Sequence, residues 1–255
     1  MRVKKFKKLF FLIGVFIIIF AIYLANVDSR VNYVALGDSI AAGQNPYGER
    51  TGYGYTDYVE NYLSRNDLLK SYIKGFAVSG YKTTDLLTDI EINKHIEEKG
   101  KEYNIRKALR ESDIVTVSIG ANDFLANIDL KNISNQTFST DTLISFVDKM
   151  VPNLKSVFKE IRKFAKKEVI VVSYFNPMPK LLESHEKEVE AVLDYANTIY
   201  RDLCKEYKMT YISVVDEFKL HPEYLPNPFD IHPNTKGYLA MATPIIQYLD
   251  ESVFN

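Results

Sequence analysis

The sequence predicts an α/β protein of three layers, α/β/α, in which a five-stranded parallel sheet lies between two layers of helices. Two observations favour this class. Five short apolar runs alternate along the chain with longer segments of helical periodicity, and such alternation is typical of a parallel sheet with helices on both faces. The chain also has 255 residues, of which 46% are hydrophobic, so it can bury one large core.

Each predicted strand is a mainly apolar run that ends near a glycine, a proline or a short polar residue. The predicted strands span residues 33–36, 71–78, 113–119, 168–174 and 209–215. The run 113–119 is β-branched on both faces, which is typical of a strand in the centre of a sheet. The expected strand order is the flavodoxin-like order 2-1-3-4-5.

Apolar residues at helical spacing predict the helices that connect these strands. The main helices are expected at residues 55–64, 142–165 and 183–207, and a charged helical face is expected over 91–110. Pro152 should kink or break the helix in which it lies. Residues 124–140 show weak periodicity and are expected to form a loop or flap. A final helix should begin with Asn234 or Thr235 as its N-cap.

The N-terminal residues 1–29 differ in composition from the rest of the chain. Five basic residues precede an uncharged apolar run over 9–25, the layout of a membrane-inserting segment. As a helix this run would be about 25 Å long, which is short for a membrane span but possible in a thin bilayer. Cleavage after Ala25 would place Tyr23 where a signal peptidase site needs a small residue, so an uncleaved anchor is favoured.

We therefore expect a signal anchor and short linker in residues 1–29 and one globular domain in residues 30–255. The basic end of the anchor should stay in the cytoplasm, so the protein is expected in the cell membrane as a single-pass protein with its domain outside the cytoplasm. If the segment were cleaved, the domain would be secreted.

Charge and cysteine content argue against several function classes. Beyond residue 25 the chain has 27 Lys and Arg against 33 Asp and Glu, a net charge of −6. This mildly acidic body has no electrostatic reason to bind nucleic acid. The lone Cys204 cannot form an internal disulfide and is expected to be a packing residue. No Cys/His cluster has zinc spacing, so neither a metal nor a cofactor is predicted.

Short polar residues follow three of the predicted strands. Gly37-Asp38-Ser39 follows the first strand, Ser79-Gly80 the second, and Gly120-Ala121-Asn122-Asp123 the third. The carboxyl ends of parallel strands share one edge of the sheet, where α/β proteins place their chemistry. A serine at that edge can be a nucleophile, although Asp and Ser after a strand taken alone also fit a helix cap.

These motifs, together with His232-Pro-Asn before the last helix, resemble the four sequence blocks of the SGNH, or GDSL, hydrolases. The resemblance covers residues 31–245. Each block is weak alone, but the four occur in the right order and at the expected places. The resemblance implies that Ser39 is a nucleophile and that an oxyanion hole is formed by the backbone N–H groups of Ser39 and Gly80 and the side-chain amide of Asn122.

A serine nucleophile needs a base, and His232 is the expected one. His221 also precedes a proline and is the alternative, whereas His95 and His185 are expected on the surface of charged helices. Family members usually carry the acid that orients the histidine three residues before it, where this chain has Phe229. The nearest acid is Asp230, two residues before His232.

Asp230 is therefore expected to orient His232, and Asp216 or a backbone carbonyl is the alternative. Asp38 and Asp123 are expected to cap or pin loops. A second departure from the family is Gly75, which stands where many members have asparagine, so a contact that braces the loop is expected to be missing.

The sequence thus predicts an esterase or lipase-like hydrolase of a small-molecule, lipid or glycan acyl ester. Two alternatives stay open. One is a carbohydrate- or lipid-binding module without hydrolytic activity on the same fold, and the other is an acyltransferase that uses the same serine.

Overall fold

The sheet has the predicted class and order. A computed structural model describes residues 29–48, 53–128 and 139–254. Its main sheet is all parallel, with the strand order β2-β1-β5-β6-β7. These strands are β1 (Val31–Gly37), β2 (Leu69–Ala77), β5 (Ile114–Ser118), β6 (Glu168–Val172) and β7 (Thr210–Ile212). The labels β3 and β4 belong to a separate hairpin, so the parallel strands follow the order 2-1-3-4-5 along the chain.

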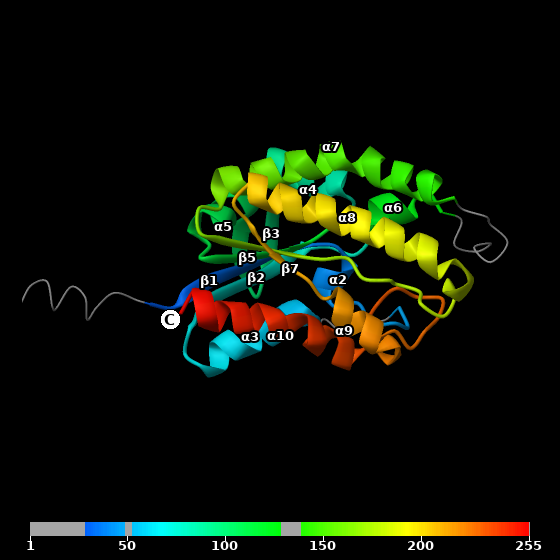
Figure 1. Ribbon diagram of the computed structural model, residues 1–255. Helices are drawn as coiled ribbons and strands as arrows, with labels where there is room; N and C mark the ends of the chain where they lie inside the picture. Colours follow the sequence, from blue (N-terminus) through cyan, green and yellow to red (C-terminus); the bar gives the residue numbers. More distant parts are fainter. Residues whose placement is uncertain (1–28, 49–52, 129–138, 255) are drawn as a thin grey trace, which may run out of the picture. The chain divides into compact units, whose positions relative to one another are not determined.

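Helices cover both faces of this sheet (Figure 1). One face carries α4 (Thr83–Glu91), α5 (Ile105–Glu111), α7 (Thr140–Phe164) and α8 (Glu186–Glu206). The other carries α2 (Ser39–Ala42), α3 (Tyr55–Arg65), α9 (Val215–Leu220) and α10 (Thr235–Ser252). In β1, Val34 and Leu36 join the first core and Tyr33 and Ala35 the second, as the alternation of a strand requires. All four side chains are buried because neither face of the sheet meets solvent.

The prediction of a helical face over 91–110 is wrong for most of that range. The structure has an antiparallel hairpin of β3 (His95–Glu98) and β4 (Lys101–Asn104), followed by the short helix α5. Lys99 and Gly100 form its turn, both with positive φ, as a tight hairpin requires. His95 accordingly lies on an exposed strand and not on a helix.

The hairpin also explains the glycine that departs from the family pattern. A Cβ at Gly75 in β2 would lie 2.5 Å from Cδ1 of Ile96, because the hairpin crosses the strand there. The backbone N–H of Gly75 donates to the Glu98 carboxylate (2.9 Å). A side chain at position 75 would have to displace the Ile96 side chain, so this packing favours glycine here. The expected loss of a contact that braces the loop stays a prediction.

The prediction of a break at Pro152 is corrected, and the predicted start of the last helix is confirmed. Helix α7 runs unbroken through Pro152, so the predicted break does not occur; its buried apolar side, which includes Val147, Met150 and Leu154, holds the helix on the sheet despite the lost hydrogen bond. The last helix begins as predicted, with the Asn234 side chain accepting from the N–H of Gly237 (3.0 Å).

Several expectations concern residues outside the described part. The membrane segment over 9–25 lies there, as does most of the predicted flap over 124–140, of which the described portion includes α6 (Ala121–Leu125). Within residues 29–48, 53–128 and 139–254, no helix is both long and apolar enough to cross a membrane. The chain from Val31 to Asn255 forms one compact unit.

Candidate active site

Ser39 lies in a tight turn directly after β1. Gly37 has φ +139°, and a Cβ there would overlap the carbonyl oxygen of Ser118, so only glycine fits. Asp38 is the N-cap of α2, and its carboxylate accepts from the N–H of Ile40 (3.0 Å). Because Asp38 performs the capping, the hydroxyl of Ser39 is left for another partner. Ser39 is only 4% exposed.

That partner is His232. Its Nε2 lies 2.7 Å from Oγ of Ser39, and the ring is buried. The loop that delivers His232 is held by its neighbours: the N–H of Asn234 donates to the carbonyl of Tyr224 (2.8 Å), and the hydroxyl of Tyr238 donates to the carbonyl of Gln44 (2.6 Å). The alternative base, His221, lies at the surface beside Glu223 (3.0 Å).

Asp230 contacts the second nitrogen of the same imidazole ring. Its Oδ1 lies 2.5 Å from Nδ1 of His232 and also accepts the backbone N–H of His232 (2.8 Å). This is an Asx turn, in which a side chain binds the backbone two residues on. The turn allows an acid two residues before the histidine to reach its ring. Asp216, the alternative acid, lies in the first turn of α9.

A role of His232 as the base for Ser39 requires one of the two tautomers of its ring. For Nε2 to accept the proton of the Ser39 hydroxyl, the neutral ring must carry its hydrogen on Nδ1 and donate it to Asp230. The side-chain nitrogen of Gln44 lies 3.5 Å from the same Nδ1, at the limit of a hydrogen bond. Asp230 is therefore the stronger partner of Nδ1.

The predicted oxyanion donors lie at the ends of three neighbouring strands. The loop ends are tied together by the N–H of Val78, which donates to the carbonyl of Gly37, and by that of Asp38, which donates to the carbonyl of Ser118 (2.9 Å each). Gly80 has φ +83°, and no atom lies within 4 Å of the position that its Cβ would occupy. The space on the Cβ side of Gly80 is thus open, and the positive φ is what favours glycine at this position.

Asn122 connects two of these loops. Its side-chain amide donates to the carbonyl of Tyr81 (2.9 Å), which holds the loop after β2 against the start of α6. An amide nitrogen has two hydrogens, so this contact uses one of them. Asp123 pins the same loop by accepting from the N–H (2.8 Å) and hydroxyl (2.6 Å) of Thr83, as expected for a structural residue.

A cluster that the sequence did not single out supports the loop from behind. The Tyr81 hydroxyl donates to Asp89 (2.9 Å), and the Lys94 ammonium donates to both the Tyr81 hydroxyl (2.5 Å) and Asp89 (2.9 Å). The three residues have no characteristic spacing, so no sequence pattern could have found them. Their contacts fix the side chain of the residue that follows Gly80.

Asp38 is the buried carboxyl group nearest in sequence to Ser39. Burial raises its pKa to about 7, the negative charge of Asp123 adds to the rise, and the hydrogen bond from Ile40 opposes it. The group is consequently only partly ionised at neutral pH. By contrast, burial raises the pKa of the Cys204 thiol to about 12, which agrees with a packing role for this residue.

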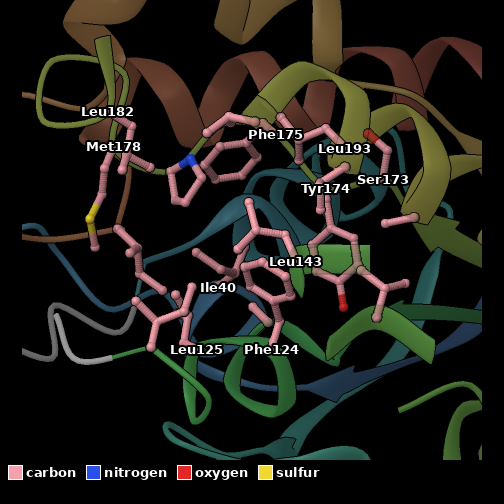
Figure 2. Close-up of a pocket in the computed structure, with 18 of the residues that line it drawn as sticks. Ile40, Phe124, Leu125, Leu143, Ser173, Tyr174, Phe175, Met178, Leu182 and Leu193 are labelled. Carbon is pink, nitrogen blue, oxygen red and sulfur yellow. The ribbon is translucent and has the colours of Figure 1, made fainter. Parts of the chain in front are cut away.

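An apolar cavity of about 130 Å³ adjoins the site. Figure 2 shows Ile40, Phe124, Leu143, Phe175 and Leu193 converging on this space from different elements. Sequence analysis did not predict the cavity, because its walls come from segments far apart in the chain. No group of three or more His, Cys, Asp or Glu side chains that could hold a metal occurs among the described residues.

The fold and the site together define a class: a parallel α/β sheet that carries a hydrogen-bonded serine, histidine and aspartate at its carboxyl edge is the arrangement of an α/β serine hydrolase. The sequence matches the GDSL-like Lipase/Acylhydrolase family over residues 35–240. The chain therefore belongs to this family of esterase-type hydrolases.

The chain also resembles known proteins in sequence or in fold. The chain is 27% identical over 229 residues to the uncharacterized protein YpmR of Bacillus subtilis, covering 87% of this chain and 82% of that protein. It resembles the extracellular lipase of Streptomyces rimosus (TM-score 0.63, 18% identity, 88% of this chain and 100% of that one). It also resembles the lipase Lip_vut3 from a goat rumen metagenome (TM-score 0.64, 19% identity, 85% and 96%).

A further structural relative is the acetylxylan esterase Axe2 of Geobacillus stearothermophilus (TM-score 0.55, 18% identity, 86% and 94%). At these identities the structural likeness concerns the fold.

Proposed function

We propose that this protein is a serine esterase that hydrolyses carboxylic acyl esters through Ser39, His232 and Asp230. The observation that carries the proposal is the continuous hydrogen-bonded series from Oγ of Ser39 to Nε2 of His232 (2.7 Å) and from Nδ1 to Asp230 (2.5 Å). A serine hydroxyl becomes nucleophilic when a base stands ready to take its proton, and this geometry supplies that base.

In the first half of the reaction, Oγ of Ser39 attacks the ester carbonyl while its proton moves to Nε2 of His232. Asp230 stabilises the imidazolium that forms. The N–H groups of Ser39 and Gly80 and the amide of Asn122 donate to the oxyanion. His232 then gives the proton to the departing alkoxide, which leaves as the alcohol and forms the acyl-enzyme.

In the second half, water attacks the acyl-enzyme. His232 takes a proton from the water, a second oxyanion forms in the same place, and the proton returns to Oγ of Ser39 as the carboxylic acid departs. The reaction consumes one ester and one water and needs no cofactor.

The comparisons support this proposal at the level of the family. The related structures include lipases and an acetylxylan esterase, and catalytic mutants of the esterase replace a serine, a histidine or an aspartate by alanine. The same three residue types meet here in hydrogen-bond contact.

The experiment is the hydrolysis of p-nitrophenyl acetate by the wild-type chain and by Ser39→Ala. We expect the variant to lose activity, because removal of a nucleophile from a triad lowers kcat by roughly 10⁶. Ser145→Ala is a matched control, since Ser145 lies on the exposed side of α7. Wild-type turnover in a folded Ser39→Ala would refute the proposal. Product acylated on an added sugar in place of free acid would instead indicate an acyltransferase.

We further propose that the enzyme acts outside the cytoplasmic membrane, held there by residues 1–29. The support is the basic and then apolar composition of this segment. In cells that express the full chain, we expect the protein to stay in the membrane after alkaline carbonate washing and to be cleaved by protease added outside. Recovery of uncleaved, full-length protein from the soluble lysate would contradict this location.

A further inference from the structure

The walls of the apolar cavity include sequence neighbours of the reacting groups. Its lining includes the residues that flank Ser39, namely Asp38 and Ile40, the residue before Asn122, and Ile231, which precedes His232. Four of the five residues of the proposed mechanism, all except Gly80, are thus next in sequence to a residue in the wall of the cavity. A group bound covalently to Oγ of Ser39 can therefore extend into this space.

The walls of the cavity are apolar along its length. Phe124 comes from α6, Leu143 and Val147 from α7, and Val189 and Leu193 from α8. These side chains offer dispersion contacts and no hydrogen bonds, which suits a hydrocarbon group.

Three of the polar residues in the lining already have hydrogen-bond partners within the protein. Asp38 accepts the N–H of Ile40, Ser173 accepts the N–H of Val214 (2.9 Å), and the Tyr174 hydroxyl donates to the carbonyl of Ile119 (2.9 Å). The lining residues His185 and Glu188 are only partly buried and lie where α8 begins. A sugar or other polar group in this cavity would lose its hydrogen bonds to water without replacement.

We propose that this cavity binds the acyl chain of the substrate and selects a straight aliphatic chain of about six carbons. This inference rests on the proposed function and names the substrate class of the same site. The size follows from the volume: an apolar cavity of about 150 Å³ holds the six carbons of benzene, so about 130 Å³ holds five carbons beyond the ester carbonyl. The preferred substrate is a hexanoyl ester.

The test is the kcat/KM of the full-length wild-type chain on p-nitrophenyl esters from acetate to palmitate. Each methylene group that is buried in the cavity should raise kcat/KM about fourfold. The kcat/KM on hexanoate should therefore exceed that on acetate by roughly 10²-fold. Beyond hexanoate the added carbons find no further cavity, and kcat/KM should level off or fall.

Substitutions of residues that line the cavity should shift the dependence of kcat/KM on acyl-chain length in opposite directions. Val189 is half-buried and lines the cavity, and Val189→Phe adds four carbons there. The ratio of kcat/KM on hexanoate to kcat/KM on acetate should fall by at least about thirtyfold. The kcat/KM on acetate itself should change by less than about threefold. Leu143→Ala removes three carbons from the facing helix and should shift the optimum to a longer ester. Thr198→Phe is the matched control, because Thr198 has the size of valine and lies on the exposed side of α8.

The outcomes separate the two proposals. If the folded wild-type chain hydrolyses no ester of any length, the proposed function is wrong. If it hydrolyses acetate and hexanoate equally well, or if Val189→Phe changes their ratio no more than Thr198→Phe does, the esterase stands and the cavity proposal is overturned. A ratio that collapses only in Val189→Phe supports the cavity as the acyl site.

Discussion

Replacing Asp230 by asparagine removes the charge that faces His232 and keeps the shape of the loop. The asparagine oxygen can still accept the backbone N–H of His232, which Asp230 binds at 2.8 Å, so the Asx turn should persist. What is lost is the charge-assisted bond of 2.5 Å between Oδ1 and Nδ1 of His232. The effect should therefore appear in catalysis and not in folding.

The magnitude follows from the change in tautomer. The amide of asparagine can donate to Nδ1, and this favours the ring form whose Nε2 carries the hydrogen and cannot accept from Ser39. In a triad of this geometry the equivalent change lowers kcat by about 10⁴, which is about 5 kcal/mol in the barrier. Gln44 cannot restore the original tautomer, because the atom that lies 3.5 Å from Nδ1 is its side-chain nitrogen, which donates and cannot accept the Nδ1 hydrogen.

The assay is steady-state hydrolysis of a soluble acyl ester by Asp230→Asn and by the control Asp216→Asn. Because Asp230 acts on the base and not on the bound ester, KM should change by less than about threefold while kcat falls. Asp216→Asn changes the acid in the first turn of α9 and should keep wild-type kcat. The reasoning is refuted if Asp230→Asn retains more than about a tenth of the wild-type kcat, or if Asp216→Asn loses as much.

Three further predictions concern the oxyanion donor, the buried carboxyl group and the hairpin. Asn122→Ala should lower kcat on an acyl ester by roughly 10²–10³ with little change in KM, because one preorganised donor is removed. Asp38 has its pKa raised from 3.8 to about 7, so the folded state holds its proton more tightly than the unfolded chain. The free energy of unfolding should consequently fall between pH 4 and 7 by up to about 4 kcal/mol relative to Asp38→Asn, as measured by urea denaturation at several pH values. Gly75→Asn, which introduces the residue common in the family, should destabilise the fold by about 1–3 kcal/mol in the same assay, because its Cβ would lie 2.5 Å from Ile96.

Each of these has an outcome that would contradict it. If Asn122→Ala kept the wild-type kcat, the Asn122 amide would not be a donor to the oxyanion. A wild-type stability that follows the same pH profile as Asp38→Asn would mean that the carboxyl group titrates as in water. For the hairpin, Ile96→Ala should restore most of the stability lost in Gly75→Asn, and a double variant as unstable as the single one would place the strain elsewhere.

The sheet and the residues at its carboxyl edge were predictable because their signals are local. Each parallel strand is a buried apolar run. A run such as 113–119 can therefore be predicted as a strand without knowing which strands lie beside it. The strands share one direction, so polar residues after three of them must meet at one edge. Ser39, Gly80 and Asn122 could therefore be named together from the sequence.

The hairpin could not be predicted in this way. Its strands are only four residues long each, and their charged composition resembles the exposed face of a helix. What favours the hairpin is contact with β2, where Ile96 packs over Gly75 and Glu98 accepts the N–H of that glycine. Such contacts join residues more than twenty positions apart in the sequence. The periodicity of a short segment cannot predict them.

The sequence by itself predicted the fold class and named Ser39 and His232 as candidate site residues, because buried runs and the turns that end them depend on neighbouring residues. Only the tertiary structure decided that Asp230 reaches His232 through an Asx turn, that Lys94 and Asp89 support the loop after Gly80, and that an apolar cavity adjoins Ser39. These features depend on the distance between atoms of separate segments. That distance is set when helices and loops pack on the sheet, and no spacing along the chain encodes it.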